Sequence, residues 1–213
     1  MYTPSQFAES RTEVLHDFIQ NNPFGTLIVN TSSGLDANHL PFEVDATSGS
    51  KSVLRCHVAR ANPIWRNVTP ESEVLVVFQG PHAYISPGWY PSKQEAGKAV
   101  PTWNYIAVHA YGSIKVIEDS EWLLGLVSRL SDRHEASRAA PWRITDAPAD
   151  FTAQMLRAIV GIEIEVSRLA GKWKLGQNRS AADVAGVVDG LSAQNDSGAA
   201  ELARLTRRLL NPV

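Results

Sequence analysis

Extended segments separated by proline, glycine and asparagine recur along this chain, and they restrict its fold more than any other feature. Residues 73–79 (EVLVVFQ) form a continuous apolar and β-branched run, typical of a strand covered on both faces. Residues 160–169 alternate apolar and polar side chains, which is the period of a half-exposed strand. Residues 102–116 follow a proline that keeps the preceding residue extended, and they also predict a strand. The fold should therefore be built around a β-sheet.

The remaining pattern adds further strands and several helices. The other predicted extended segments are residues 25–30, 39–44, 52–59, 83–86 and 172–175. Helices are predicted at residues 3–20, 63–68, 119–132, 149–158, 180–191 and 197–210, the first with Thr3 as its cap. Turns are expected at residues 31–38 and 45–51, a break at Gly80 and Pro81, and a polar loop at residues 91–99. Strands mostly in meander order with such helices predict a mainly β, α+β fold, an antiparallel barrel with helical additions.

Composition excludes several classes of protein. The 213 residues are 44% hydrophobic and 20% charged, which are globular values, and no apolar run is long enough for a membrane helix. The start of the chain lacks the basic and apolar regions of a signal peptide, so we expect a cytoplasmic protein. The single cysteine, Cys56, excludes an internal disulfide framework. The net charge of -2 gives no electrostatic attraction to nucleic acid.

Residues 80–109 concentrate aromatic rings, turn-forming residues and hydrogen-bonding side chains in one stretch. The rings are those of His82, Tyr84, Trp89, Tyr90, Trp103, Tyr105 and His109. Aromatic rings with polar tips at both rims of a loop suit a flat, partly polar ligand. The other interpretation is that these rings only close the end of a barrel, since aromatic residues are common in strands.

Two groups of basic residues lie at strand ends. Arg55, His57 and Arg60 belong to residues 52–60, with Arg55 and His57 predicted opposite Leu54, Cys56 and Val58. The second group is Lys172, Lys174 and Arg179, in the segment KWKLGQNR. With the amides of Asn62, Gln177 and Asn178, these groups could hold a phosphate or carboxylate. Alternatively, they form a solvated rim.

Other kinds of site receive little support. His39, His57, His82 and His109 lack metal-motif spacing, so no metal site is predicted. Asp132, His134 and Glu135 form a charge cluster at a helix end, and with no G-x-S-x-G motif no catalytic residue is assigned. No GxGxxG motif follows a strand, which argues against a doubly wound dinucleotide fold. The connection between the two C-terminal helices is longer than a helix-turn-helix turn, and their leucines suit packing or dimerisation.

Five motifs, in order along the chain, resemble the PaiB family, bacterial proteins described as FMN-binding negative transcriptional regulators. They are HLPF at 39–42, HVARANPIW at 57–65, GPHAYISPGWY at 80–90, VPTWNYIAVHAYG at 100–112 and KWKLGQNRS at 172–180. The resemblance extends to about Val188. Gly88 and Gly176 stand where the family pattern leads us to expect serine.

The resemblance implies an FMN-binding split β-barrel like that of pyridoxamine phosphate oxidases and flavin reductases, built as a homodimer with FMN at the interface. It makes Arg55, His57, Arg60, Asn62, Lys174, Gln177 and Arg179 candidates for the FMN phosphate and ribityl chain. It makes Tyr84, Ile85, Ser86, Thr102, Trp103 and Asn104 candidates for contacts around the isoalloxazine ring. On this basis residues 1–191 form the split-barrel domain with inserted helices, and residues 192–213 form a C-terminal helix for packing or dimerisation.

The function expected from this resemblance is FMN-dependent negative transcriptional regulation by a homodimer. Direct DNA binding is supported neither by charge nor by a motif. The alternative is an FMN-dependent oxidoreductase acting on a small molecule, with the flavin carrying hydride chemistry and residues 89–103 shaping the substrate pocket. Its substrate and electron donor have no signature in the sequence.

Overall fold

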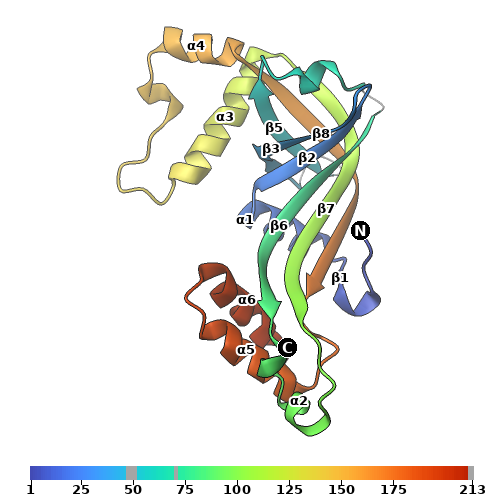
Figure 1. The fold of residues 1–213 in the computed structure, drawn as a ribbon. Coiled ribbons are helices and arrows are strands. Elements are labelled where there is room, and N and C mark those ends of the chain that lie inside the picture. Colours follow the sequence, from blue (N-terminus) through green and yellow to red (C-terminus); the bar gives the residue numbers. More distant parts are fainter. Residues whose placement is uncertain (47–51, 70–71, 211–213) are drawn as a thin grey trace. The chain divides into compact units, whose positions relative to one another are not determined.

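The computed structural model describes residues 1–46, 52–69 and 72–210 (Figure 1), so most of the turn predicted at residues 45–51 lies outside the described residues. The chain divides into two compact units, which are described separately below. Unit 1 comprises Met1–Phe18, Gln79–Val108 and Ala170–Val213. Unit 2 comprises Ile19–Phe78 and His109–Leu169.

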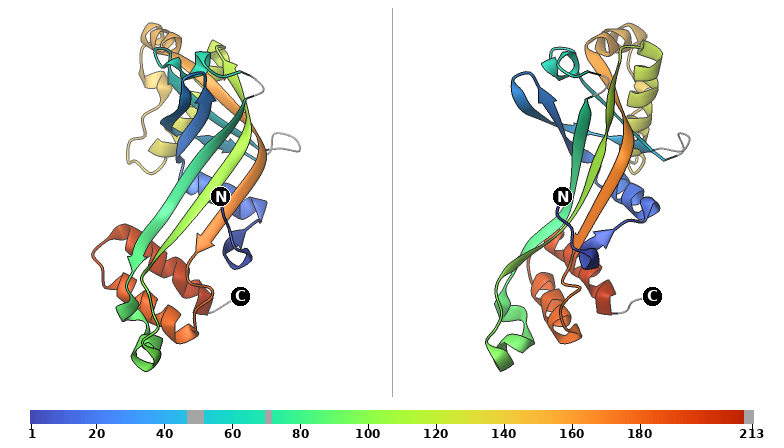
Figure 2. Two further views of the ribbon diagram at one scale, coloured as in Figure 1. Left: turned by 45° about the vertical axis from the view of Figure 1, so that its right-hand side comes forward. Right: turned by 90° about the vertical axis from the view of Figure 1, so that its right-hand side faces the viewer.

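The described strands form an eight-stranded sheet in the order β3-β2-β6-β7-β8-β5-β4, with β1 paired to β8. The bounds are Ala8–Glu9 for β1, Phe24–Thr31 for β2, Gly34–Pro41 for β3, Glu43–Asp45 for β4, Val53–Ala59 for β5, Glu73–Ile85 for β6, Thr102–Ile117 for β7 and Ile159–Lys174 for β8. The three long strands β6, β7 and β8 run side by side (Figure 2) and each contributes residues to both units. The predicted α+β class is therefore confirmed.

In unit 2, antiparallel strands wrap around an apolar core. β2 and β3 form a hairpin, while β5 pairs with β4 on one side and with β8 on the other. β3, at one end of the strand order, contacts β5, the next-to-last strand at the other end, which brings the two sides of the sheet together as a barrel requires. Leu54, Cys56 and Val58 are buried, whereas the side chains of Arg55 and His57 lie on the opposite face, as the alternation predicted.

Two helices of unit 2 pack beside β5 and β8 (Figure 1). Helix α3, Ser120–Glu135, begins at Asp119, whose carboxylate accepts a hydrogen bond from the Trp122 amide at 2.7 Å. The Trp122 ring lies against Gly161 of β8, where a Cβ atom would come within 2.4 Å of it. Helix α4, Ala149–Arg157, contacts α3. Both helices were predicted, and together they form one wall of a cavity described below.

In unit 1, three helices pack around the ends of the long strands. These are α2, Pro91–Ala96, α5, Ala181–Ser192, and α6, Ser197–Arg207. Side chains from strands and helices share one apolar cluster, which includes Ile85, Tyr90, Ile106, Leu175, Leu191 and Leu202. The predicted C-terminal helices are confirmed, except that Arg208–Leu210 is a short 3-10 turn.

The segment after β6 is fixed to α5. Gly186 and Gly190 of α5 lie against Trp89, and a Cβ atom on Gly186 would come within 2.0 Å of the Trp89 carbonyl oxygen. The Ser92 hydroxyl and amide donate hydrogen bonds of 2.8 and 3.1 Å to the buried Asp183 carboxylate. The loop predicted at residues 91–99 is wrong in part, because Pro91 starts a helix there and Gly97 ends it at φ 66°.

Three other local predictions are corrected by strand pairing. The N-terminal helix, α1, spans Thr12–Asn21 rather than residues 3–20, because Ala8 and Glu9 are extended and pair with β8. β6 continues through Gly80 and Pro81 without a break. β3 begins at Gly34, within the predicted turn, because it pairs with β2 along its whole length. In each case tertiary hydrogen bonding overrides the local signal.

No helix among the described residues has the length and apolar character needed to cross a membrane.

Candidate functional site

An exposed aromatic surface lies on the part of the sheet that belongs to unit 1. We call His82, Tyr84, Trp103 and Lys174 the Trp103 face. The Trp103 ring stacks on His82 with ring centroids 5.7 Å apart, and the Tyr84 ring meets it edge-on at 6.4 Å. Trp103 is 48% exposed and Tyr84 49%. Two large aromatic side chains that stay half exposed beside each other offer a flat contact surface for a ligand or a partner.

Lys174 supplies the positive charge of this face. Its Nζ donates hydrogen bonds to Thr102 Oγ1 at 2.6 Å and to the Trp103 carbonyl oxygen at 2.8 Å. Burial lowers the pKa of the Lys174 ammonium; Tyr105 partly opposes this shift, and the neighbouring Lys172 adds to it. Among the residues whose side chains the structure describes, Lys174 forms no ion pair with a carboxylate. An anion bound there could pair with the Lys174 ammonium, whose charge no described carboxylate neutralises.

Three other residues predicted to contact the isoalloxazine ring are buried or hydrogen-bonded within unit 1. Ile85 is fully buried in the apolar cluster, and Asn104 is 3% exposed. Ser86 is the cap of a short 3-10 turn, because its hydroxyl accepts a hydrogen bond from the Gly88 amide at 3.1 Å. Of the residues predicted to contact the ring, Tyr84 and Trp103 thus present the largest open surface.

The turn after β8 holds the last two predicted FMN contacts. Gln177 is engaged internally, since its side chain accepts from the Leu175 amide and donates to the Trp173 carbonyl oxygen. The Arg179 guanidinium lies over the Tyr90 ring, 4.7 Å from its centroid. Gly176, which stands where serine was expected, has φ 94°, a conformation that would strain a serine.

In unit 2, the predicted basic group is largely committed to internal bonds. Arg55 donates to Asp45 and Glu163, each at 2.9 Å. Arg60 pairs with Glu118 and also donates to two backbone carbonyls, those of Arg157 at 2.8 Å and Ile159 at 3.2 Å. Asn62 donates to Asn38 and accepts from the Ile64 amide. These bonds fix β5 and the turn that follows it.

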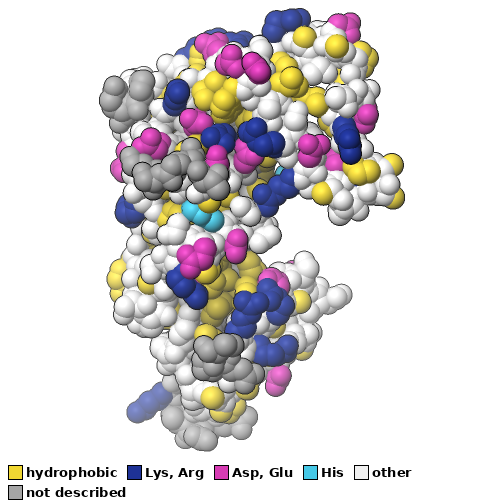
Figure 3. All heavy atoms as spheres, turned by 180° about the vertical axis from the view of Figure 1, so that it is seen from behind, with side chains coloured by type: hydrophobic (Ala, Val, Ile, Leu, Met, Phe, Trp, Pro, Cys, Tyr) yellow, Lys and Arg dark blue, Asp and Glu magenta, His cyan; other side chains and the backbone are white. Residues whose placement is uncertain are grey.

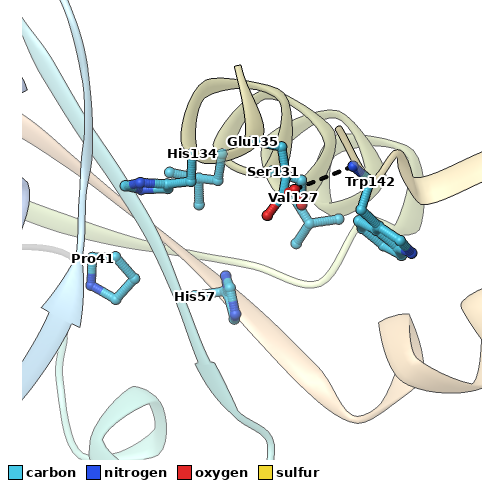
Figure 4. Close-up of a pocket in the computed structure, with 8 residues that line it drawn as sticks. Pro41, His57, Val127, Ser131, His134, Glu135 and Trp142 are labelled. Carbon is cyan, nitrogen blue, oxygen red and sulfur yellow. Dashed lines mark hydrogen bonds between the residues drawn. The ribbon is translucent and has the colours of Figure 1, made fainter. Parts of the chain in front are cut away.

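His57, the fourth member of that group, faces a pocket. Figure 4 shows its ring between Pro41 on one side and the α3 residues Val127, Ser131, His134 and Glu135. The Glu135 carboxylate accepts a hydrogen bond of 3.2 Å from the Trp142 amide, which holds the opposite wall. Burial lowers the pKa of His57, so the ring is neutral at pH 7. No sequence pattern indicated this pocket, because its walls come from segments far apart in the chain.

The chemistry of the available side chains favours the Trp103 face as the place for a flavin. FMN carries a phosphate anion and a flat ring system, and this face offers an ammonium group and half-exposed rings. Arg55, in contrast, is already shared between two carboxylates that would repel a phosphate. Among the described residues, no three His, Cys, Asp or Glu side chains converge in a way that could hold a metal ion.

Comparison with known families assigns the class. The family described as "Putative FMN-binding domain" matches residues 1–168. The fold is also that of the FAD and heme binding protein from Mycobacterium smegmatis, with a TM-score of 0.58, 16% identity, and coverage of 84% of this chain and 78% of that one. The chain thus has the flavin-binding split-barrel fold that its motifs predicted.

Comparison with individual proteins extends the match to nearly the whole chain. It is 34% identical over 205 residues to the Bacillus subtilis protein named "Protease synthase and sporulation protein PAI 2", which covers 96% of each chain. It is also 34% identical over 242 residues to an uncharacterized protein of Emericella nidulans, covering 97% of this chain and 96% of the other. The chain belongs to the FMN-binding PaiB family, and its cofactor is FMN.

Proposed function

We propose that this protein is a homodimeric, FMN-binding negative regulator of transcription, with the flavin held on the Trp103 face. The observation that carries the proposal is an exposed indole and phenol beside an ammonium group that has no carboxylate partner among the described residues. The ring would contact Trp103 and Tyr84, and Lys174 would lie close enough to bind an anionic group of FMN. When bound, FMN supplies redox chemistry, and the protein residues orient it and limit its exposure to water.

The half-exposed rings also support the homodimer. A single chain leaves Trp103 and Tyr84 open over about half of their surface. In a dimer, a flavin between the two copies would cover the exposed faces of these rings, and the second copy would shelter the flavin from solvent. Light scattering of the purified protein with and without FMN gives the oligomeric state directly.

Regulation through DNA contact by a basic surface has little support. On the face shown in Figure 3, acidic side chains lie beside basic ones, in keeping with the net charge of -2. On α6, Arg204 is paired with Glu201. We therefore propose that FMN occupancy changes the dimer or the helices of residues 180–210, and so biases an equilibrium between two states.

The test is FMN retention by the wild-type protein and by two variants. Lys174→Met should weaken FMN binding about ten- to hundredfold, because it removes a charged hydrogen-bond donor. Arg204→Met is the control, since it removes an exposed cation on α6. Absorption spectra after desalting should show the flavin band for the wild type and the control, and a much weaker band for Lys174→Met. Equal retention by all three proteins would remove the Trp103 face from the proposal.

A second measurement separates regulation from catalysis. NADH or NADPH is added to the FMN-loaded protein, and the flavin band is followed over time. A regulator should show slow bleaching and an FMN-dependent shift of operator DNA, either alone or with a partner protein. Rapid bleaching with no DNA shift would instead assign an FMN-dependent oxidoreductase.

A further inference from the structure

The pocket at His57 continues into a larger apolar cavity within unit 2. The smaller part has a volume of about 280 Å³ and the larger part about 430 Å³. The two parts share His57, Val127 and Trp142, so they adjoin. The walls are β5, α3 and the segment from Trp142 to α4. The larger part lies within the range of about 300–1,000 Å³ that small-molecule sites have, and the smaller part extends it.

The larger cavity has no formal charge along its walls. Its lining includes Ala59, Ile144, Phe151, Met155 and Leu156, and none of its lining residues is Asp, Glu, Lys or Arg. A phosphate or carboxylate would therefore be desolvated there without a partner, whereas a neutral apolar molecule would replace water favourably. The chemistry differs from that of the Trp103 face, which carries a cation.

Large apolar side chains at this cavity remain open to solvent. Trp142 is 45% exposed, Phe151 52% and Met155 43%. Isolated exposed apolar residues are ordinary, but three that line one concavity form a surface that a ligand would cover. The indole and phenyl rings suit an aromatic ligand in particular.

His57 is the polar side chain that lines both parts of the pocket, whereas Ser131, His134 and Glu135 line only the smaller part. Its Nδ1 is buried and has no hydrogen-bond partner. Its ring forms no hydrogen bond with any residue that the structure describes, and Figure 4 shows none between the ring and the other residues drawn. A neutral imidazole offers one donor and one acceptor. With Nδ1 sealed, Nε2 is the nitrogen available to a ligand in the pocket.

We propose that this pocket binds a neutral, flat aromatic molecule with a single hydroxyl group, which pairs with His57 Nε2 while the rings pack against Trp142, Phe151 and Met155. This inference goes beyond the proposed function, because it assigns a second ligand site that is separate from the flavin. A regulator with such a site would respond to two small molecules.

The test compares two probes that differ by one hydroxyl group, 2-naphthol and naphthalene, in equilibrium dialysis with the full chain. The wild-type protein should bind 2-naphthol about fivefold more tightly than naphthalene, the effect of one net hydrogen bond. His57→Phe should bind both probes equally. His109→Phe is the matched control, since His109 also has a buried Nδ1 without a partner but does not line the pocket, and it should keep the fivefold preference.

Two further measurements establish that the probes occupy this cavity and that FMN does not. Ala147→Trp fills the larger cavity and should weaken the binding of both probes at least tenfold. An unchanged circular dichroism spectrum of this variant shows that its fold is intact. Saturating FMN should leave the affinity for 2-naphthol unchanged. The proposal is overturned if neither probe binds, if His57→Phe retains the preference, or if FMN displaces 2-naphthol. FMN retention is read separately from the flavin band, so failure of this proposal leaves the flavin assignment standing.

Discussion

Replacement of Arg55 by methionine distinguishes an internal ion pair from a flavin contact. Arg55 bridges Asp45 of β4 and Glu163 of β8 through two bonds of 2.9 Å. The side chains are 17%, 25% and 23% exposed, so they are neither fully buried nor freely solvated. Arg55→Met keeps the aliphatic part of the side chain but removes the cation that the Asp45 and Glu163 carboxylates share.

The expected loss of stability follows from this burial. Exposed ion pairs contribute up to about 1 kcal/mol, whereas breaking a buried pair costs about 3–5 kcal/mol. We expect Arg55→Met to lower the free energy of unfolding by about 2 kcal/mol, between these limits. For a chain of 213 residues, that corresponds to a decrease in Tm of about 4–8 °C. FMN affinity should change less than about twofold, because the pair lies outside the proposed flavin face.

The assay is urea unfolding combined with FMN titration for four proteins. Arg204→Met is the control for an exposed pair and should cost less than about 1 kcal/mol. Adding Glu163→Gln to Arg55→Met should restore part of the lost stability, since it removes the carboxylate charge that Arg55 no longer pairs with. A variant with wild-type stability and much weaker FMN binding would refute this reasoning and would make Arg55 a phosphate ligand, as the family resemblance implied.

Two further predictions concern packing and pH. Gly186→Ala should destabilise the protein by about 1–3 kcal/mol, because the new methyl group would lie 2.0 Å from the Trp89 backbone oxygen. Gly125→Ala in α3 is the control, because its methyl group would meet only the flexible end of an arginine. It should be neutral or stabilising by up to about 1 kcal/mol. Thermal unfolding of both variants measures the difference, and equal Tm values would contradict the close packing. Burial lowers the pKa of three histidines below 6.5, namely His16, His57 and His109. Below that pH the unfolded chain then binds more protons than the folded chain. The urea concentration at the unfolding midpoint should therefore be lower at about pH 5.5 than at about pH 7. A higher midpoint at the lower pH would be inconsistent with buried neutral histidines.

Most regular elements of this fold could be predicted because their signals are local. The alternation around Cys56 placed the neighbouring residues on the correct faces, and Asp119 marked the start of α3. The errors arose where a distant strand supplied the hydrogen bonds. Ala8 and Glu9 pair with β8, so α1 begins later than its apparent capping sequence indicated.

The proposed site could be predicted only in part, for a similar reason. The motifs pointed to Trp103 and Lys174, and the structure brings them into contact. The same motifs made Arg55 an equally strong candidate for contact with the FMN phosphate. What separates the two cations is whether a carboxylate lies beside each in space, and Glu163 is far from Arg55 along the chain.

Motifs and periodicity alone were enough to predict the family, the cofactor and the alternation of strands and helices, because they are properties of neighbouring residues. Which charged groups are free to bind a ligand became apparent only from the folded chain. Folding also creates the pocket at His57, whose walls come from β5, α3 and the segment leading into α4. Charge compensation and cavity shape depend on distances between segments that are remote in the chain, and no local pattern encodes those distances.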